Sequence, residues 1–170
     1  MTPGVAEAAG VPLVVFALHG ERFALQGRAV REVVRAVAVA ALPDAPGVVE
    51  GVINYRGRLA PVLDVRSRFG LPPQLLDPSQ HFILADAGSR LVALRVDRAL
   101  DLLEVPADAI EAADSVAPGS RRTEGVARLP DGLVVIHDLE RFLSLDEGNA
   151  LDAALSAAGT GDEHRDGGAT

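Results

Sequence analysis

The sequence predicts an all-β protein with short helices, built from small barrels. Short strand-like runs, about nine or ten in all, follow each other closely along the chain, and turn residues separate them. The helical patterns between these runs are too short for the crossover helices that a parallel sheet requires. A chain of 170 residues supports one substantial core, or two small cores that share an interface.

The first part of the chain contains a hairpin and one ambiguous segment. Residues 1–10 are mostly small, which predicts a flexible N-terminus. Residues 11–18 (VPLVVFAL) and 22–25 (RFAL) are apolar runs on either side of His-Gly-Glu, a composition typical of a hairpin turn. The valines of residues 28–42 fit both an amphipathic helix and a strand, and we expect a short helical turn near residues 27–30 that continues as a strand.

A second hairpin, at the centre of the chain, has an arginine at its tip. The run GVINY (51–55) leads into Arg56 and Gly57, and the apolar run LAPVLD (59–64) follows. Because glycine adopts positive φ without a steric cost, Gly57 suits a tight turn that leaves Arg56 exposed. Pro61 cannot donate to a sheet ladder, so it predicts an edge strand or a bulge.

Two short helical units each follow an apolar strand, begin with aspartate and contain phenylalanine. Asp64 is a suitable N-cap for a helix that ends at Gly70, and Asp138 for a closing helix that ends near Leu143. The likeness of the two units predicts two related sub-barrels. Further elements are expected as hairpins at residues 81–96 and 125–136, a strand at 100–105, and a loop with room for one short strand at 106–122.

The charge distribution separates an acidic C-terminal tail from the body. Residues 146–170 hold six acidic residues and one arginine and carry −5 of the net charge of −8. We expect a single domain over residues 11–145, followed by a tail that is helical over residues 149–158 and disordered from residue 159. The body is nearly balanced in charge, which argues against nucleic acid as a partner because phosphate binding requires clustered positive charge.

The residues on which most enzymes and metal proteins depend are missing or isolated. The chain has no cysteine, and all of its basic residues are arginine, which excludes thiol and Schiff-base chemistry. Its four histidines stand at no metal-ligand spacing, and there is no nucleophile elbow and no phosphate-binding loop. No apolar run approaches the ~20 residues of a membrane span, and residues 1–10 lack signal-peptide features. We therefore expect a cytoplasmic binding protein without catalytic activity, metal, cofactor or membrane insertion.

The central run GVINYRGRLAPVLDVRSRF (51–69) resembles the signature of the CheW family, the adaptors of bacterial chemosensory arrays. The usual pattern is Gly-Val-x-Asn-x-Arg-Gly, an apolar strand with proline, and then Asp and a short helix that ends near Phe. The resemblance continues on both sides of this run and covers roughly residues 11–145, with further similar segments at 16–25, 30–33, 91–102 and 134–143.

The resemblance implies two packed five-stranded SH3-like β-barrels and no enzymatic activity. It also implies an adaptor that joins the cytoplasmic tip of a chemoreceptor, a methyl-accepting chemotaxis protein, to the CheW-like regulatory domain of a CheA-type histidine kinase. By resemblance, Arg56, Glu32 and Val30 belong to the receptor-binding groove, and Asn54 and Gly57 of the signature complete that site. A guanidinium suits this role because it binds a carboxylate through two parallel hydrogen bonds. No residue is implied for the kinase contact.

Alternatives remain open at the level of the sequence. An adaptor of this kind could serve pilus motility or a developmental pathway rather than swimming. A small ligand-binding β-barrel module is the alternative from a different class. For Arg56, the alternative to a partner contact is an intramolecular pair with Glu32 that shapes the groove, and both can hold together.

Overall fold

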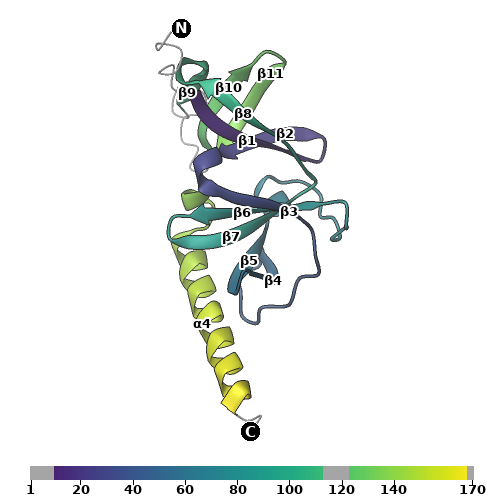
Figure 1. The fold of residues 1–170 in the computed structure, drawn as a ribbon, viewed down its shortest axis with the longest axis vertical. Helices are drawn as coiled ribbons and strands as arrows, with labels where there is room; N and C mark the ends of the chain where they lie inside the picture. Colours follow the sequence, from purple (N-terminus) through teal and green to yellow (C-terminus); the bar gives the residue numbers. More distant parts are fainter. Residues whose placement is uncertain (1–9, 113–122, 168–170) are drawn as a thin grey trace.

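The chain folds into two β-sheets that pack against each other, and a long helix runs beside the second sheet (Figure 1). The computed structural model describes residues 10–112 and 123–167, with residues 160–167 as backbone only. The first sheet lies at one end of the molecule, and the long helix ends at the other. The predicted all-β fold class with short helices is confirmed. The flexibility predicted for residues 1–10 falls outside the described residues, except at Gly10, which begins the first strand instead.

The first sheet has six strands in the order β8-β1-β2-β11-β10-β9. β2 and β11 are parallel, and the other neighbours are antiparallel. The sixth strand, beyond the five that the resemblance implies, is the three-residue β9, which lies in the segment predicted as a loop with one short strand. In sheet order, the strands are Arg98–Pro106, Gly10–Leu18, Glu21–Gln26, Gly132–His137, Thr123–Leu129 and Ile110–Ala112.

The second sheet has five strands in the order β3-β6-β7-β5-β4, with β7 and β5 parallel. In sheet order, they are Val30–Arg35, His81–Ala87, Arg90–Val96, Arg58–Asp64 and Val49–Tyr55. The chain beyond β3 reaches β4 at the other edge, where Ala40 and Val52 exchange backbone hydrogen bonds of 2.9 and 2.8 Å. This bridge helps to close the second sheet into a barrel.

The two halves of the chain are interlocked. The first half places the hairpin β1–β2 in the first sheet and then crosses to form β3, β4 and β5 of the second. The second half places β6–β7 in the second sheet and then crosses to form β8 to β11 of the first. Each sheet is therefore completed by both halves. Residues 71–80, here called the linker, connect the two halves.

The side chains of the central strands alternate between cores, because successive residues of a strand point to opposite faces. In β1, Leu13 enters the core inside the first sheet, whereas Phe16 enters a core between the sheets. In β6, Phe82 enters the core inside the second sheet, whereas Ile83 faces the central core. The molecule thus has one core in each barrel and a third core where the barrels meet.

Short helical segments occur where the sequence predicted them. η1 (Gly27–Ala29) leads into β3, as expected for the ambiguous segment. Asp64 caps α2 (Val65–Arg68), and Asp138 caps η3 (Leu139–Arg141); each aspartate accepts a hydrogen bond from a backbone N–H two residues later, at 3.1 and 3.0 Å. The likeness predicted for these two units is confirmed. One further segment, η2 (Ala107–Ala109), precedes β9.

Of the two placements predicted for Pro61, the edge strand is wrong, whereas the register of the β4–β5 ladder does shift close to it, between Val49 and Gly51. β5 has β4 on one side and β7 on the other. Pro61 pairs with Val52 of β4, whereas the ladder between β5 and β7 begins only at Val62. The missing N–H of proline therefore interrupts no bond to β7.

The C-terminal helix α4 (Leu145–Gly167) begins at a capping box that the sequence analysis missed. The hydroxyl of Ser144 accepts a hydrogen bond from the N–H of Glu147 at 3.1 Å, and the Glu147 carboxylate accepts one from the N–H of Ser144 at 2.9 Å. One turn later, Leu151 is fully buried in the core between the sheets. The folded body therefore continues beyond residue 145.

The extent of α4 differs from the expected tail. The sequence predicted helix over residues 149–158 and disorder from residue 159, but the helix continues without interruption to Gly167. Gly159 and Gly161 lie within it. The charge of the tail and its helix therefore belong to the same element.

Two buried arginines hold the linker. Arg66 and Arg95 are only 4% and 5% exposed. Arg66 donates to the Asp97 carboxylate at 2.6 Å, and Arg95 donates to the carbonyl oxygen of Gln74 in the linker at 2.9 Å. Asp97 also accepts a hydrogen bond from the N–H of His19 at 2.8 Å. This network joins the linker to the turn of the β1–β2 hairpin.

Candidate functional site

The tip of the β4–β5 hairpin is a two-residue turn formed by Arg56 and Gly57. Both have positive φ, +52° and +83°, as in the hairpin turn of type I′. The Asn54 side-chain oxygen accepts a hydrogen bond from the N–H of Gly57 at 2.9 Å, and Tyr55 pairs with Arg58 across the turn. The positive φ predicted for Gly57 is confirmed, whereas the left-handed conformation of Arg56 was not predicted.

Glu32 of β3 lies against this tip, and its Oε2 atom accepts two hydrogen bonds. The Tyr55 hydroxyl donates one at 2.6 Å, and Nη2 of Arg56 donates the other at 3.2 Å. Because β3 and β4 are the two edges of the second sheet, these bonds join its edges. The intramolecular pair considered for Arg56 is present, yet 73% of the Arg56 side chain stays exposed.

The ring of Tyr55 contacts the same arginine. The guanidinium carbon of Arg56 lies 5.2 Å from the ring centroid, within the range of a cation–π interaction. The hydrogen bond to the Glu32 carboxylate raises the pKa of Tyr55, and partial burial raises it further, against the opposing charge of Arg56. We call Glu32, Tyr55 and Arg56 the tip cluster.

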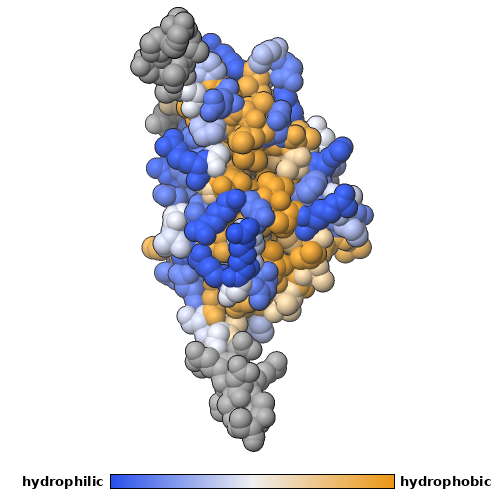
Figure 2. Space-filling model, in the orientation of Figure 1, coloured by the Kyte–Doolittle hydropathy of each residue, from blue (hydrophilic) through white to orange (hydrophobic). Residues whose placement is uncertain are grey.

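An apolar groove lies beside the tip cluster, between β3 and β8. It is a hollow of about 390 Å³, and apolar residues from both strands, together with Glu32, form much of its lining. Three large apolar side chains there are exposed to solvent: Val33 at 38%, Leu100 at 45% and Leu102 at 66%. Figure 2 shows apolar surface across the middle of the molecule, with hydrophilic residues on either side. Such a groove suits an apolar partner with charged groups at its end.

The residues expected at the receptor site have different roles in the structure. Val30 and Glu32 line the groove, and Glu32 also binds Arg56. Asn54 and Gly57 do not line it; they form the turn that carries Arg56. Tyr55 was missed, because it occupies a variable position of the signature and its contact with Glu32 depends on the closure of the sheet.

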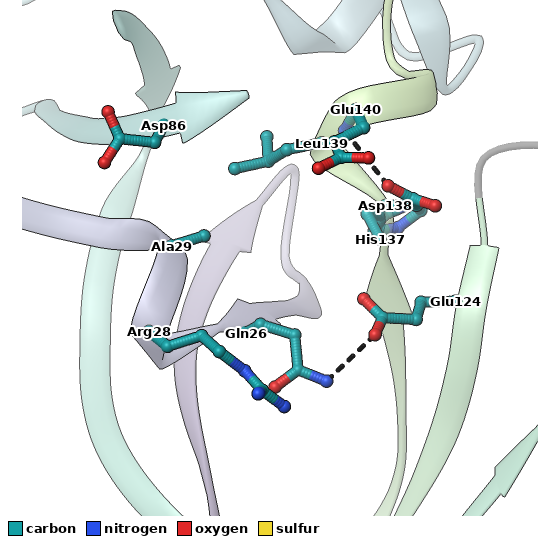
Figure 3. A pocket seen from close by; sticks show the side chains of 9 residues that line it. All are labelled: Gln26, Arg28, Ala29, Asp86, Glu124, His137, Asp138, Leu139 and Glu140. Carbon is teal, nitrogen blue, oxygen red and sulfur yellow. Dashed lines mark hydrogen bonds between the residues drawn. The ribbon is translucent and has the colours of Figure 1, made fainter. Parts of the chain in front are cut away.

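A second, polar pocket of about 300 Å³ lies between β2 and the segment around η3 (Figure 3). Gln26 donates a hydrogen bond to Glu124 at 3.0 Å across this pocket, and Arg28 and Glu140 also line it. Among the residues that the structure describes, no group of three or more histidines and carboxylates is placed to hold a metal ion. In the same part of the chain, no helix has the length and apolarity to cross a membrane.

Comparison with known proteins identifies the family of this chain. The sequence model of the CheW-like domain matches residues 12–147, which is most of the chain. The chain belongs to this family. The resemblance seen in the central run is thereby confirmed.

Relatives of this CheW-like protein align over most of their own length. The chain is 29% identical to the chemotaxis protein CheW of Rhizobium meliloti over 143 residues, 83% of this chain and 92% of the relative. It is 27% identical to the chemotaxis protein CheW of Bacillus subtilis over 157 residues, 91% of this chain and 95% of the relative. To the chemotaxis protein CheW of Klebsiella aerogenes it is 26% identical over 148 residues, 86% of this chain and 89% of the relative.

A solved structure supports the fold. The crystal structure of the scaffolding protein TtCheW from Thermoanaerobacter tengcongensis has a TM-score of 0.74 and 27% identity, and covers 81% of this chain and 95% of that chain. The predicted pair of packed SH3-like barrels is confirmed. The protein is a non-catalytic scaffold of the chemotaxis type.

Proposed function

We propose that this protein is a cytoplasmic adaptor that connects the tip of a chemoreceptor to a CheA-type histidine kinase. The observation that carries the proposal is an exposed arginine, Arg56, bound to Glu32, which lines the groove. A helical receptor tip offers an apolar face and carboxylates together. The groove and Arg56 match both features.

The charge of Arg56 is available to a partner because its internal bond is weak. Its bond to Glu32 measures 3.2 Å, and an exposed ion pair of this kind contributes little in water. A partner carboxylate that reaches Arg56 inside a docked, drier interface gains a stronger bond. The groove supplies the desolvation that makes this exchange favourable.

We assign no residue to the kinase contact. The proposed kinase partner is the regulatory domain, which the resemblance gives as CheW-like itself. The receptor contact is therefore the part of the function that a point mutation in this protein tests most directly.

The test is co-sedimentation of the full chain with a soluble receptor-tip fragment and the kinase regulatory domain. Arg56→Ala should weaken receptor binding ~5- to 30-fold, since it removes a hydrogen-bonded charge worth about 1–2 kcal/mol. Kinase binding should be unchanged. Arg58→Ala is the matched control: Arg58 lies two residues away, is exposed, and forms no ion pair within the part of the chain that the structure describes.

Two outcomes would contradict the proposal in different ways. Equal loss of receptor binding in Arg56→Ala and Arg58→Ala would show a general charge effect and remove Arg56 from the site. Absence of binding by the wild type to both partners would overturn the adaptor function itself.

A further inference from the structure

Glu32 shares a single oxygen atom between two donors of unequal strength. The bond from Tyr55 is 2.6 Å long, a short O–H···O contact to a carboxylate, whereas the bond from Arg56 is 3.2 Å. Tyr55 therefore provides the stronger of the two interactions. Arg56 is bound more loosely, although it carries the charge.

This division of bonds matters when a partner carboxylate binds Arg56. If Nη2 is the atom that turns to the partner, the guanidinium leaves Glu32, and the Glu32 anion then lies next to a second carboxylate without the charge of Arg56. The hydroxyl of Tyr55 keeps a hydrogen bond on Glu32 throughout. Arg31, the cation next to Glu32 in the sequence, is bound to Asp86 at 2.9 Å and is not free to replace Arg56.

We propose that Tyr55 is a positioning residue that holds Glu32 in place while Arg56 transfers from Glu32 to a carboxylate of the partner. The ring of Tyr55 guides the same transfer from the other side, because Arg56 lies over its face. The inference rests on the proposed function, since it requires a partner that binds Arg56.

The chain contains one tyrosine and no tryptophan, so the absorbance of tyrosinate reports Tyr55 alone. An absorbance titration of the wild type should give a midpoint above the ordinary value of about 10, and Glu32→Gln should bring it down towards that value. At neutral pH, tyrosine emission should be stronger in Glu32→Gln, because a hydrogen-bonded carboxylate quenches the excited phenol. Identical titrations and emission in both proteins would overturn the proposal, whatever the partner.

Binding of the receptor-tip fragment tests the transfer itself. Tyr55→Phe keeps the ring and removes only the hydroxyl, so that, among the described residues, Glu32 keeps only its hydrogen bond from Arg56. We expect binding to weaken about 3- to 10-fold. Glu32 then holds Arg56 more tightly, and it keeps no hydrogen bond from Tyr55 when Arg56 leaves. In the Glu32→Gln background, where no carboxylate needs to be held, Tyr55→Phe should change binding less than about 2-fold.

The outcomes separate the transfer from a structural role and from the proposed function. If Tyr55→Phe weakens receptor binding equally in the wild-type and Glu32→Gln backgrounds, or in neither, the proposed transfer is overturned. If the wild type fails to bind the receptor-tip fragment, the proposed function fails and the transfer fails with it. The titration then still shows whether Tyr55 holds Glu32.

Discussion

Gly20 and Gly57 occupy matching positions in two hairpin turns. Each follows a non-glycine residue with φ of +52°, His19 or Arg56, and the glycines themselves have φ of +79° and +83°. A Cβ atom added at either glycine would meet nothing within 4 Å. The cost of replacing them is therefore a backbone cost, without a steric clash against neighbours.

Alanine at either position should lower the free energy of unfolding by a similar amount, about 1 kcal/mol, measured by urea denaturation. Gly57→Ala should also weaken binding of the receptor-tip fragment, because this turn directs Arg56. Gly20→Ala is the matched control, with the same backbone strain in a different hairpin. If both variants bind like the wild type, the turn does not direct Arg56.

At the scale of elements, Asp97 connects segments from both halves. It follows β7 and binds Arg66 of α2, while its backbone partner His19 lies in the β1–β2 turn. Burial by itself would raise the pKa of Asp97, but hydrogen bonds from His19, Arg66 and Gln80 outweigh burial and lower it below its ordinary value. The folded state thus favours the charged carboxylate.

Asp97→Asn should reduce the free energy of unfolding at neutral pH by about 2 kcal/mol, less than for a fully buried pair, since 28% of the Asp97 side chain is exposed. A lowered pKa contributes stability above the ordinary value of about 3.9, and that contribution is lost as the pH falls through the folded-state pKa. The difference in free energy of unfolding between the wild type and Asp97→Asn should therefore become smaller below about pH 4, measured by urea denaturation.

The control for this prediction is Asp131→Asn, which breaks an ion pair with Arg22 at the surface. Its carboxylate has a lowered pKa as well, chiefly through the hydrogen bond from Arg22. Because 69% of the Asp131 side chain is exposed, Asp131→Asn should reduce the free energy of unfolding much less than Asp97→Asn. Equal destabilisation by the two variants would show that the buried network around Arg66 adds nothing.

The elements that the sequence predicted well depend on local patterns. The hairpins at residues 81–96 and 125–136 have two apolar runs joined by a clear turn, and Arg56 with Gly57 could be placed at a tip for the same reason. The missed features depend on distant contacts. Tyr55 meets Glu32 only because the edges of a sheet close, and Pro61 is tolerated beside β7 only because of the register.

At the scale of the whole molecule, neither half can complete a sheet. The β1–β2 hairpin needs β8 and β11 as neighbours, and the β6–β7 hairpin needs β3 and β5. An isolated hairpin is at best marginally stable in water, and three or more strands are needed for independent stability. The interlocked halves should therefore fold as one cooperative unit.

Cleavage of the linker between Leu75 and Leu76 tests this cooperativity, since Leu75 is 90% exposed. The separate fragments, residues 1–75 and 76–170, should each lack a cooperative thermal transition in far-ultraviolet circular dichroism. Mixing them should restore the β-sheet spectrum, with a midpoint that depends on concentration. A cooperative transition in either fragment alone would contradict the interlocked fold as the source of stability.

The interlocked topology also fixes the order of events on the ribosome. β1 and β2 are synthesised first, but their neighbour β11 ends only at His137. At ~5–20 residues per second, the N-terminal hairpin waits roughly 5–20 s for its last partner strand. During that time its apolar faces have no sheet to cover them. The nascent hairpin therefore exposes apolar surface until translation of this scaffold is almost complete.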